Sequence, residues 1–504
     1  DFTHSWLFRV CYSFTFHELV VKMPSDQISL HSSTKPEKVG VDNPNLVLEI
    51  QKTTEAHHPS SHTTSKSSNN GHKHSAYMIS SVSDKSPKLI EEYDPYLNRT
   101  VKHPTTFFET LIHMLKASLG TGILAMPNAF HNAGYLVGSI GTMIIGLLCT
   151  YTIHILVHSE YELCRRKKVA SMTYPETAEA ALIMGPKPTR KFAPYAGAVC
   201  NTFLLAYQIG SCSIYFVFVA TNIKAVADEY INPDINVRIY MCILLLPLIL
   251  VNWVRNLKYL APFSSIANAV TLISFGIIAY YLFSDIRTLD DRNAVANFSG
   301  MPLFFGTVLF AMEAIGVVMP LENEMKCPEK FGSVFGVLNC AMFPITLLYT
   351  VVGFFGYLRY GSSAEGSITL NLPSDEILAQ SVKLMLAFAI YITHALNCYV
   401  AVDIAWTQKL KGKIQNNNLF WEYITRTGMV LVTFGFAVAI PNLELFISLV
   451  GALCLSTMGL SFPAIIQLLT FWNDYKGIHF TLFFFKEFNC NPYFNPWVCS
   501  RHFH

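Results

Sequence analysis

The chain has 504 residues, of which 52% are hydrophobic and only 14% are charged, a composition far too apolar for a soluble protein of this length. A formal net charge of +2, without basic arms interleaved with aromatic residues, predicts no nucleic-acid partner. The twelve cysteines form no CxxC pair and no Cys/His spacing for a tetrahedral metal site, so we predict neither a metal nor another cofactor.

The N-terminal stretch divides into two parts. Residues 1–22 begin with Asp and contain no small-residue signal cleavage site, and the first methionine is Met23. We expect translation to start at Met23 and the leader before it to be non-native. Residues 23–102 are rich in Ser, Thr, His, Lys and Asn, which predicts a disordered tail because so polar a stretch cannot bury a core.

Long apolar runs separated by short polar loops follow the tail. Each is close to the ~20 residues that a helix needs to cross a bilayer. About ten spans are predicted, at residues 106–130, 133–157, 193–222, 238–253, 260–284, 301–320, 334–357, 380–406, 422–440 and 443–471. The sequence therefore predicts an all-α polytopic membrane protein over residues 103–476. Residues 477–504 form an atypical tail whose best apolar run, residues 478–485, is too short for a final span.

The loop charges predict the orientation of the spans. Basic residues gather in alternate loops, which the positive-inside rule places in the cytoplasm together with the N-terminus. They are Arg165, Arg166, Lys167, Lys168, Lys187, Arg190, Lys191, Arg255, Lys258, Lys326, Lys330, Lys409, Lys411 and Lys413. A loop on the opposite side holds the sequon Asn297-Phe298-Ser299, so we expect glycosylation at Asn297. The sequence leaves open whether the membrane is the plasma membrane or a late endosomal or lysosomal one.

The first span carries charges that an ordinary lipid-facing helix avoids. Glu109, His113, Lys116 and Gly120 are spaced i, i+4, i+7 and i+11, so they share one helix face. Each charge at membrane depth costs about 2.5–3.5 kcal/mol on insertion scales, so this face is expected to look into the protein. His113 changes charge near pH 6.5, which suits proton coupling; the alternative is a satisfied core histidine.

A helix break is predicted directly after this face. Gly120, Thr121 and Gly122 favour the helix weakly and carry little bulk, so the backbone can unwind and present its polar groups to a ligand. A zwitterionic amino acid suits such a break, because its carboxylate meets free N–H groups and its ammonium meets free carbonyls. The alternative is that the glycines form a close helix-packing patch.

The sixth span has a matching interruption around Glu313, Ala314 and Gly316, with Pro320 beyond. Paired breaks at corresponding depths, five spans apart, indicate an inverted repeat. Glu313 could receive the proton, position the substrate ammonium group, or hold the broken helix. In the third span, Tyr207 and Gln208 are candidate lining residues, although such groups also bond helix to helix.

Three segments resemble the proton-coupled amino acid transporters of the amino acid/auxin permease group, in particular its insect members. They read LIHMLKASLGTGILAMPNAFHNAG, YQIGSCSIYFVFVATN and FAMEAIGVVMPLENEMKCPEKF, and the resemblance covers residues 93–476. It implies a five-plus-five inverted repeat of the APC/LeuT type with broken helices 1 and 6, usually with eleven spans. It also implies symport of glycine, alanine or proline with protons, and it links the histidine of this motif, here His113, to proton coupling.

The predicted function is proton-coupled symport of small neutral amino acids, with amino acids, protons and membrane lipid as partners. An amino-acid-sensing receptor that signals to a cytoplasmic partner through the N-terminal tail is the alternative. No Ser-His-Asp grouping, metal-ligand set or phosphate-binding loop predicts an enzyme. A channel would need a polar stripe on several helices, whereas only the first span has one.

Overall fold

The computed structural model describes residues 93–473, except 103, 232–234, 256–258, 285–286, 290, 313–314 and 411–416. Residues 1–22, most of the predicted tail and residues 477–504 lie outside the described residues. Residue 94 already belongs to the same unit as the helices, and the boundary predicted at residue 103 stays a prediction. The following sections concern this unit.

The described part of the chain is helical, and its β-structure is a single isolated bridge between Thr105 and Met325. The helices of the first half are α4 (Phe107–Ser118), α5 (Gly122–Ala133), α6 (Tyr135–Lys167), α7 (Tyr174–Met184), η1 (Thr189–Phe192), α8 (Ala193–Ala227), α9 (Val237–Asn252) and α10 (Ala261–Ser284). Those of the second half are η3 (Phe298–Gly300), α11 (Met301–Ala311), α12 (Ile315–Asn323), η4 (Pro328–Lys330), α13 (Val337–Tyr360), η5 (Gly361–Ser363), η6 (Ile368–Asn371), α14 (Ile377–Val402), η7 (Asp403–Leu410), α15 (Asn418–Ala439), α16 (Leu443–Val450), η8 (Gly451–Ser461) and α17 (Phe462–Thr470). Both η7 and η8 are π-helical.

Each predicted span coincides with helix, which confirms the all-α polytopic class. Among the described residues, seven helices are long and apolar enough to cross a membrane. The predicted first span is divided between α4 and α5, α9 has 16 residues, and α15 carries the charges of Glu422 and Arg426. Whether these three also cross the membrane stays a prediction. Both halves run through the same order, an interrupted span followed by a long one, as a five-plus-five repeat requires.

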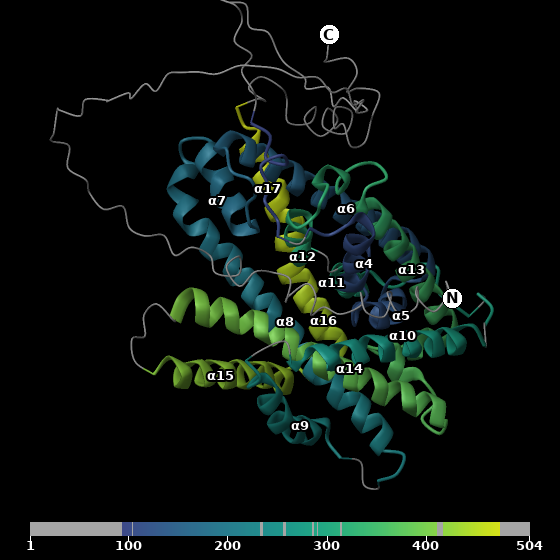
Figure 1. The fold of residues 1–504 in the computed structure, drawn as a ribbon. Coiled ribbons are helices and arrows are strands. Elements are labelled where there is room, and N and C mark those ends of the chain that lie inside the picture. The colour runs from purple at the N-terminus through teal and green to yellow at the C-terminus, as the bar shows by residue number, and fades with distance from the viewer. Residues whose placement is uncertain are drawn as a thin grey trace, which may run out of the picture. The chain divides into compact units, whose positions relative to one another are not determined.

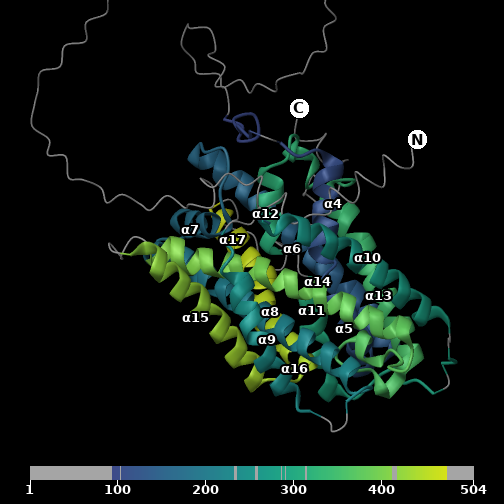
Figure 2. The ribbon, with the colours of Figure 1, turned by 60° about the horizontal axis from the view of Figure 1, so that its bottom comes forward.

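The helices pack in two groups (Figures 1 and 2). Helices α4, α5 and α6 each contact α13, and α11 contacts α5 and α6. In the second group α8 contacts α9, α14 and α15, and α10 lies on α14. The last predicted span, α16–η8–α17, contacts α11 and α6 on one side and α8 on the other. A cavity between the groups would therefore be bounded by both interrupted spans.

Local sequence explains two helix starts. Thr106 caps α4, and its backbone N–H donates to Glu109 Oε2 over 2.8 Å, which closes a capping box. Glu109 thus stabilises the start of the helix. The sequence analysis had instead expected it on a charged face that looks into the protein. Helix α7 was missed by the sequence analysis, although Thr173 and Glu176 form the same capping box with Pro175 in the first turn.

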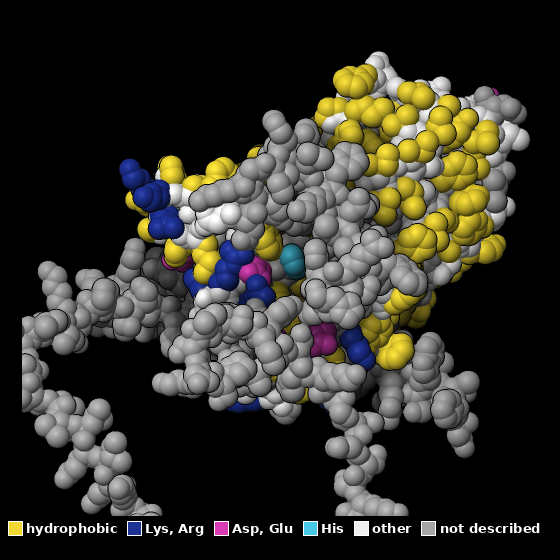
Figure 3. All heavy atoms as spheres, turned by 90° about the horizontal axis from the view of Figure 1, so that it is seen from above, with side chains coloured by type: hydrophobic (Ala, Val, Ile, Leu, Met, Phe, Trp, Pro, Cys, Tyr) yellow, Lys and Arg dark blue, Asp and Glu magenta, His cyan; other side chains and the backbone are white. Residues whose placement is uncertain are grey.

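The outer helices expose apolar side chains. On α9 these are Ile239, Ile243, Leu246 and Leu250, each 51–65% exposed and spaced along one face. Figure 3 shows hydrophobic side chains covering one flank of the molecule. Such a surface is unsuited to water but matches the hydrocarbon of a bilayer. The chain is an integral membrane protein.

Candidate functional site

The first interrupted span unwinds for three residues between α4 and α5. Helix α4 ends at Ser118, whose carbonyl accepts hydrogen bonds from the Gly120 N–H (2.9 Å) and from the Tyr349 hydroxyl on α13. Helix α5 begins at Gly122. The break is thus fixed from outside the span, and the backbone between the two half-helices lies outside the regular helical hydrogen-bond ladder.

The second break faces the first. Helix α11 ends at Ala311 and α12 begins at Ile315, so the interruption predicted from the sequence is present. Glu313 and Ala314 themselves lie outside the described residues. Gly122 packs directly on Ala311, because a Cβ at residue 122 would lie 2.4 Å from the Ala311 Cα. Glycine is required at residue 122 by this close approach, which joins the two breaks.

A cavity of about 350 Å³ adjoins both interrupted spans. Its wall is built from α4, the first break, α8, α10, α12, α14 and η7. Five residues predicted from the sequence as substrate-binding line it: Gly120, Thr121, Tyr207, Gln208 and Gly316. The sixth described candidate, Gly122, serves instead in the contact with Ala311.

Three of the cavity-lining side chains carry polar atoms that are buried without a hydrogen-bond partner in the described part of the chain. They are Thr121 Oγ1, Tyr207 Oη and Gln208 Oε1. A buried polar group without a partner costs about 1–3 kcal/mol, and native structures usually satisfy such groups. Three of them on one cavity wall indicate a place where a polar ligand binds.

Two charged side chains of opposite sign also line the cavity, Lys116 from α4 and Asp403 at the start of η7. Much of the remaining wall is apolar, with Phe275 and Leu272 from α10 and Leu386 from α14 among its side chains. The site thus combines one charge of each sign with an apolar lining. Such a lining suits a small ligand that carries polar groups.

Other lining residues were not singled out as site residues by the sequence analysis. Asn268 and Thr271 on α10 are three residues apart, which places both on one helix face, and this polar pair in an apolar span was the available signal. Tyr215 and Asn397 belong to the wall as well, and the Asn397 side-chain amide donates to the Tyr215 hydroxyl over 3.1 Å. This bond ties α8 to α14 within the cavity wall.

His113 and the glycosylation site lie away from the cavity wall. His113 is buried in α4 with 5% of its surface exposed, and the residues of α4 that reach the wall are Lys116 and Ala117. Asn297 is exposed and caps η3, and its side-chain oxygen accepts from the Ser299 N–H over 3.4 Å. The sequon is therefore accessible, and its modification stays a prediction.

The interrupted spans, their contact and the cavity between the two groups of helices define a class, that of membrane transporters with substrate sites at discontinuous helices. Residues 103–491 match the family model described as transmembrane amino acid transporter protein, and the chain belongs to this family.

Two relatives cover most of the chain. It is 44% identical over 386 residues to the proton-coupled amino acid transporter-like protein pathetic of Drosophila melanogaster, which spans 77% of this chain and 82% of that protein. It is 26% identical over 385 residues to the probable amino acid transporter skat-1 of Caenorhabditis elegans, over 73% and 81% of the two chains. Among solved structures, a closed conformation of the nucleobase-cation-symport-1 transporter Mhp1 with bromovinylhydantoin bound is 12% identical, with a TM-score of 0.40, and covers 72% of this chain and 78% of that one.

Proposed function

We propose that this protein is a symporter that carries small neutral amino acids of the glycine, alanine and proline class together with protons. The observation that carries the proposal is the cavity beside both helix breaks, with three buried polar atoms that have no hydrogen-bond partner in the described residues. The printed name of the Drosophila relative, a proton-coupled amino acid transporter-like protein, supports the same function.

The substrate is proposed to bind with its charged groups at the breaks. Its carboxylate meets the N–H groups at the start of a half-helix, and its ammonium group meets free carbonyls at the end of the other. The side chains of Thr121, Tyr207 and Gln208 supply the remaining hydrogen bonds. Because the cavity wall is largely apolar and its two charges cancel, a neutral side chain is favoured over a charged one.

Proton coupling is proposed to involve His113 and Glu313. An imidazole has an ordinary pKa of about 6.5 and so changes charge within the physiological range. His113 lies one turn before Lys116, which lines the cavity, and its protonation can therefore change the field at the substrate site through a neighbouring cation. In the sequence, Glu313 lies at the second break, and its carboxylate is the other group that we propose for proton coupling.

We propose that the end of the molecule bearing α7 faces the cytoplasm. Basic side chains gather there, at the end of α6 and along η1, and Figure 3 shows Lys and Arg side chains on the visible part of this face. The positive-inside rule places such a surface in the cytoplasm, together with the N-terminal tail. The membrane is the plasma membrane or a late endosomal or lysosomal one.

Uptake of labelled alanine, glycine and proline into cells that express the full chain tests the symport. External pH values of about 5.5 and about 7.5 bracket the ordinary imidazole pKa. We expect strong uptake at the acidic pH, and its loss in His113→Ala at equal surface amount. His131→Ala, which alters a half-buried histidine in the last turn of α5, is the matched control and should retain uptake.

The receptor alternative makes a different prediction in the same cells. A receptor binds the amino acid and needs little flux, so binding to the purified protein without uptake by surface-expressed protein would support it. Uptake that is equal at the two pH values would instead contradict proton coupling while leaving amino acid transport in place.

A further inference from the structure

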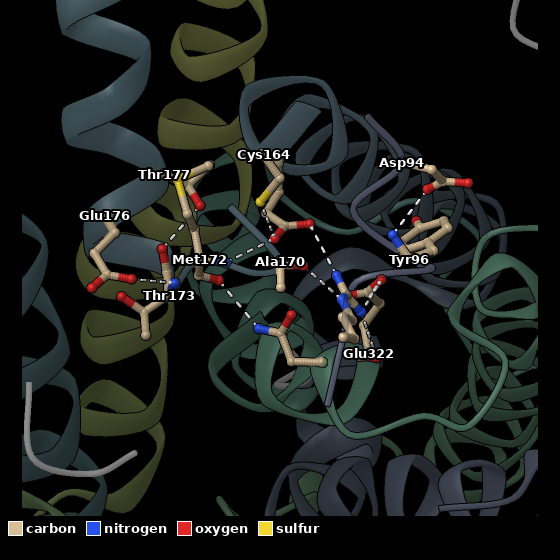
Figure 4. A network of polar contacts seen from close by, with 12 residues as sticks. Asp94, Tyr96, Cys164, Ala170, Met172, Thr173, Glu176, Thr177 and Glu322 are labelled. Atoms are coloured by element: carbon tan, nitrogen blue, oxygen red, sulfur yellow. Dashed lines mark hydrogen bonds and ion pairs between the residues drawn. The ribbon is translucent and has the colours of Figure 1, made fainter. Parts of the chain in front are cut away.

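A second polar site lies at the α7 end of the molecule, apart from the cavity (Figure 4). The segment of residues 94–102, which precedes α4, lies against the end of α6, the connection between α6 and α7, and α12. Arg99 is the residue of this segment that reaches inward, and 5% of its side chain is exposed. A guanidinium is buried this deeply only when carboxylates or carbonyls surround it.

Arg99 contacts two carboxylates and two carbonyls. Its Nη1 lies 3.0 Å from Glu322 Oε1 and donates to the Glu322 carbonyl over 3.2 Å, and its Nε donates to the Ala170 carbonyl over 3.0 Å. Its Nη2 lies 3.7 Å from Glu160 Oε2. The side chains of Glu160 and Glu322 are 0% and 1% exposed, so water contributes little to their solvation.

Glu160 is held from its other side. Its Oε1 accepts hydrogen bonds from the Cys164 thiol and from the Met172 N–H, both over 3.0 Å. Its Oε2 and the Arg99 Nη2 have no hydrogen-bond partner in the described part of the chain. The second carboxylate therefore lies beside the guanidinium without a full hydrogen bond to it, at a distance where a charge-assisted bond is not made.

The charges of the surrounding groups do not balance this site. Burial lowers the pKa of Arg99, but Glu322, Glu160 and Tyr96 together raise it above its ordinary value, so Arg99 keeps its single positive charge. The Tyr96 ring packs on both the Tyr161 ring and the Arg99 guanidinium.

Other nearby ionisable groups have contacts outside this site. Glu162 pairs with Arg165 and Arg166 over 2.9 Å and 2.6 Å. Two carboxylates consequently share one cation in a buried place, which leaves one excess negative charge.

We propose that Glu160 and Glu322 form a proton-binding site, in which the two carboxylates beside Arg99 bind one proton between them. When two carboxylates share a buried site, ionisation of the second is disfavoured by the charge of the first. With one proton bound, the cluster holds one negative and one positive charge. The proton also supplies a hydrogen-bond donor at Glu160 Oε2, which otherwise has no hydrogen-bond partner in the described residues.

The site lies where the two groups of helices are joined, so binding of the proton can affect both groups. The α6–α7 connection is bonded to the cluster through the Ala170 carbonyl and the Met172 N–H, and Asn323 of α12 donates to the Met172 carbonyl over 3.1 Å. Helix α6 packs with the interrupted spans, whereas α7 packs on α8 of the other group. The proton thus binds at a joint between the two groups of helices, and its use in transport rests on the symport proposed above.

Infrared spectroscopy of the purified full chain in detergent tests the site without any transport. A protonated carboxylic acid has a carbonyl band that a carboxylate lacks, and the band shifts in heavy water. We expect one such band to grow as the pH falls. Glu160→Gln and Glu322→Gln should each abolish it, because either change removes the excess charge and leaves an ionised pair with Arg99.

Two further variants complete the design. Glu162→Gln alters a carboxylate on the same helix that is already paired with two arginines, so the band should be unchanged. Arg99→Met should raise the pH midpoint of the band by about 1–3 units, because both carboxylates then lose their cation. Persistence of the band in both Gln variants, or no titration of this band in the wild type, would overturn the proposal.

If a Gln variant fails to fold, Glu160→Asp and Glu322→Asp decide the outcome. Each keeps the charge but withdraws the carboxylate from Arg99, so the midpoint should move, and an unmoved midpoint would contradict the site. Uptake measurements remain separate from this result. A titrating band in a protein whose uptake is independent of pH would leave the proton site intact and remove the symport.

Discussion

The cavity and the Arg99 site both contain buried polar groups, but these groups differ in how far they are hydrogen-bonded within the protein. In the cavity wall, the side chains of Thr121, Tyr207 and Gln208 have polar atoms without a hydrogen-bond partner among the described residues. Around Arg99, by contrast, the guanidinium is bonded to a carboxylate and two carbonyls that come from two different elements. The cavity keeps its bonding capacity for a ligand, whereas the Arg99 site uses most of its capacity to connect parts of the protein.

A site that binds a ligand and a site that ties elements of the protein together can therefore be distinguished in one structure. A group that must bind and release a ligand gains by being unsatisfied in the protein, and its loss should affect binding more than stability. A group that ties elements together should show the reverse. Removal of one member of a buried ion pair leaves its partner charged and unpaired, which destabilises the fold.

The largest effect is expected where the two interrupted spans meet. Gly122→Val would place a branched side chain on the Ala311 backbone, so the spans must separate. We expect more than about 3 kcal/mol of destabilisation, at or beyond the usual range for overpacking, because backbone rather than a flexible side chain is in the way. Thermal unfolding in detergent measures this. Gly276→Val on α10, where a Cβ meets nothing within 4 Å, is the control and should unfold near the wild-type temperature.

The Arg99 site should show the next largest effect. Arg99→Met is expected to cost about 3–5 kcal/mol of unfolding free energy, because it leaves Glu160 and Glu322 buried without their cation. Arg165→Met breaks an ion pair that is 38% exposed at the arginine, and it should cost less than about 1 kcal/mol. Equal losses from the two variants would remove the distinction between the buried site and a surface pair.

A combined variant sharpens that prediction. Arg99→Met together with Glu160→Gln and Glu322→Gln removes all three charges at nearly constant volume. It should recover much of the stability lost in Arg99→Met alone, since the cost arises from unpaired buried charge. Chemical or thermal unfolding of the three proteins side by side measures the recovery. A triple variant as unstable as Arg99→Met would mean that the packing of the arginine stem, rather than its charge, holds the segment.

The cavity should show the opposite pattern, with a smaller effect on stability than on binding. Tyr207→Phe deletes a buried hydroxyl that has no hydrogen-bond partner in the described residues. We expect unfolding free energy to change by at most about 0.5 kcal/mol and amino acid binding to weaken by about 1 kcal/mol. Tyr215→Phe, which breaks the bond to Asn397, should lower stability more than Tyr207→Phe does. Binding is read by calorimetry, and a destabilised Tyr207→Phe protein with unchanged binding would contradict the assignment.

Changes at two glycosylation sequons should have the smallest effect on stability. They nevertheless test the orientation of the protein in the membrane directly. Asn98 and Asn297 are both exposed, yet only the loop of Asn297 is predicted to face away from the cytoplasm. Asn297→Gln should remove a glycan and raise electrophoretic mobility, whereas Asn98→Gln should change neither mobility nor uptake. A mobility change in Asn98→Gln would reverse the orientation and place the Arg99 site on the outer face.

Much of the fold followed from the sequence because membrane spans are set by length and apolarity, which are local properties. The breaks at Gly120 and near Gly316 were also predictable, since weak helix formers at matching places in two spans are visible in the chain. Helix α7 was missed because its 11 residues are too few to form an apolar run of membrane-spanning length, although its capping box was readable.

The Arg99 site was beyond the sequence for a different reason. Arg99 stands in a polar segment whose composition resembles the tail before it, and its partners are 61 and 223 residues away along the chain. Such pairing arises from tertiary packing, which composition does not encode. Asn268 similarly became a site residue only when α10 was placed beside the first break. The π-helical register of η7 and η8 also has no simple local signal.

The contact between Gly122 and Ala311 also constrains how this sequence can change over evolutionary time. A Cβ at residue 122 would meet the backbone of Ala311, so position 122 has no room for any side chain. Shortening residue 311 to glycine would not make room for alanine at 122, because the Cα of residue 311 would still be in the way. Related chains are therefore expected to keep glycine at this position while the residues of their cavity walls differ.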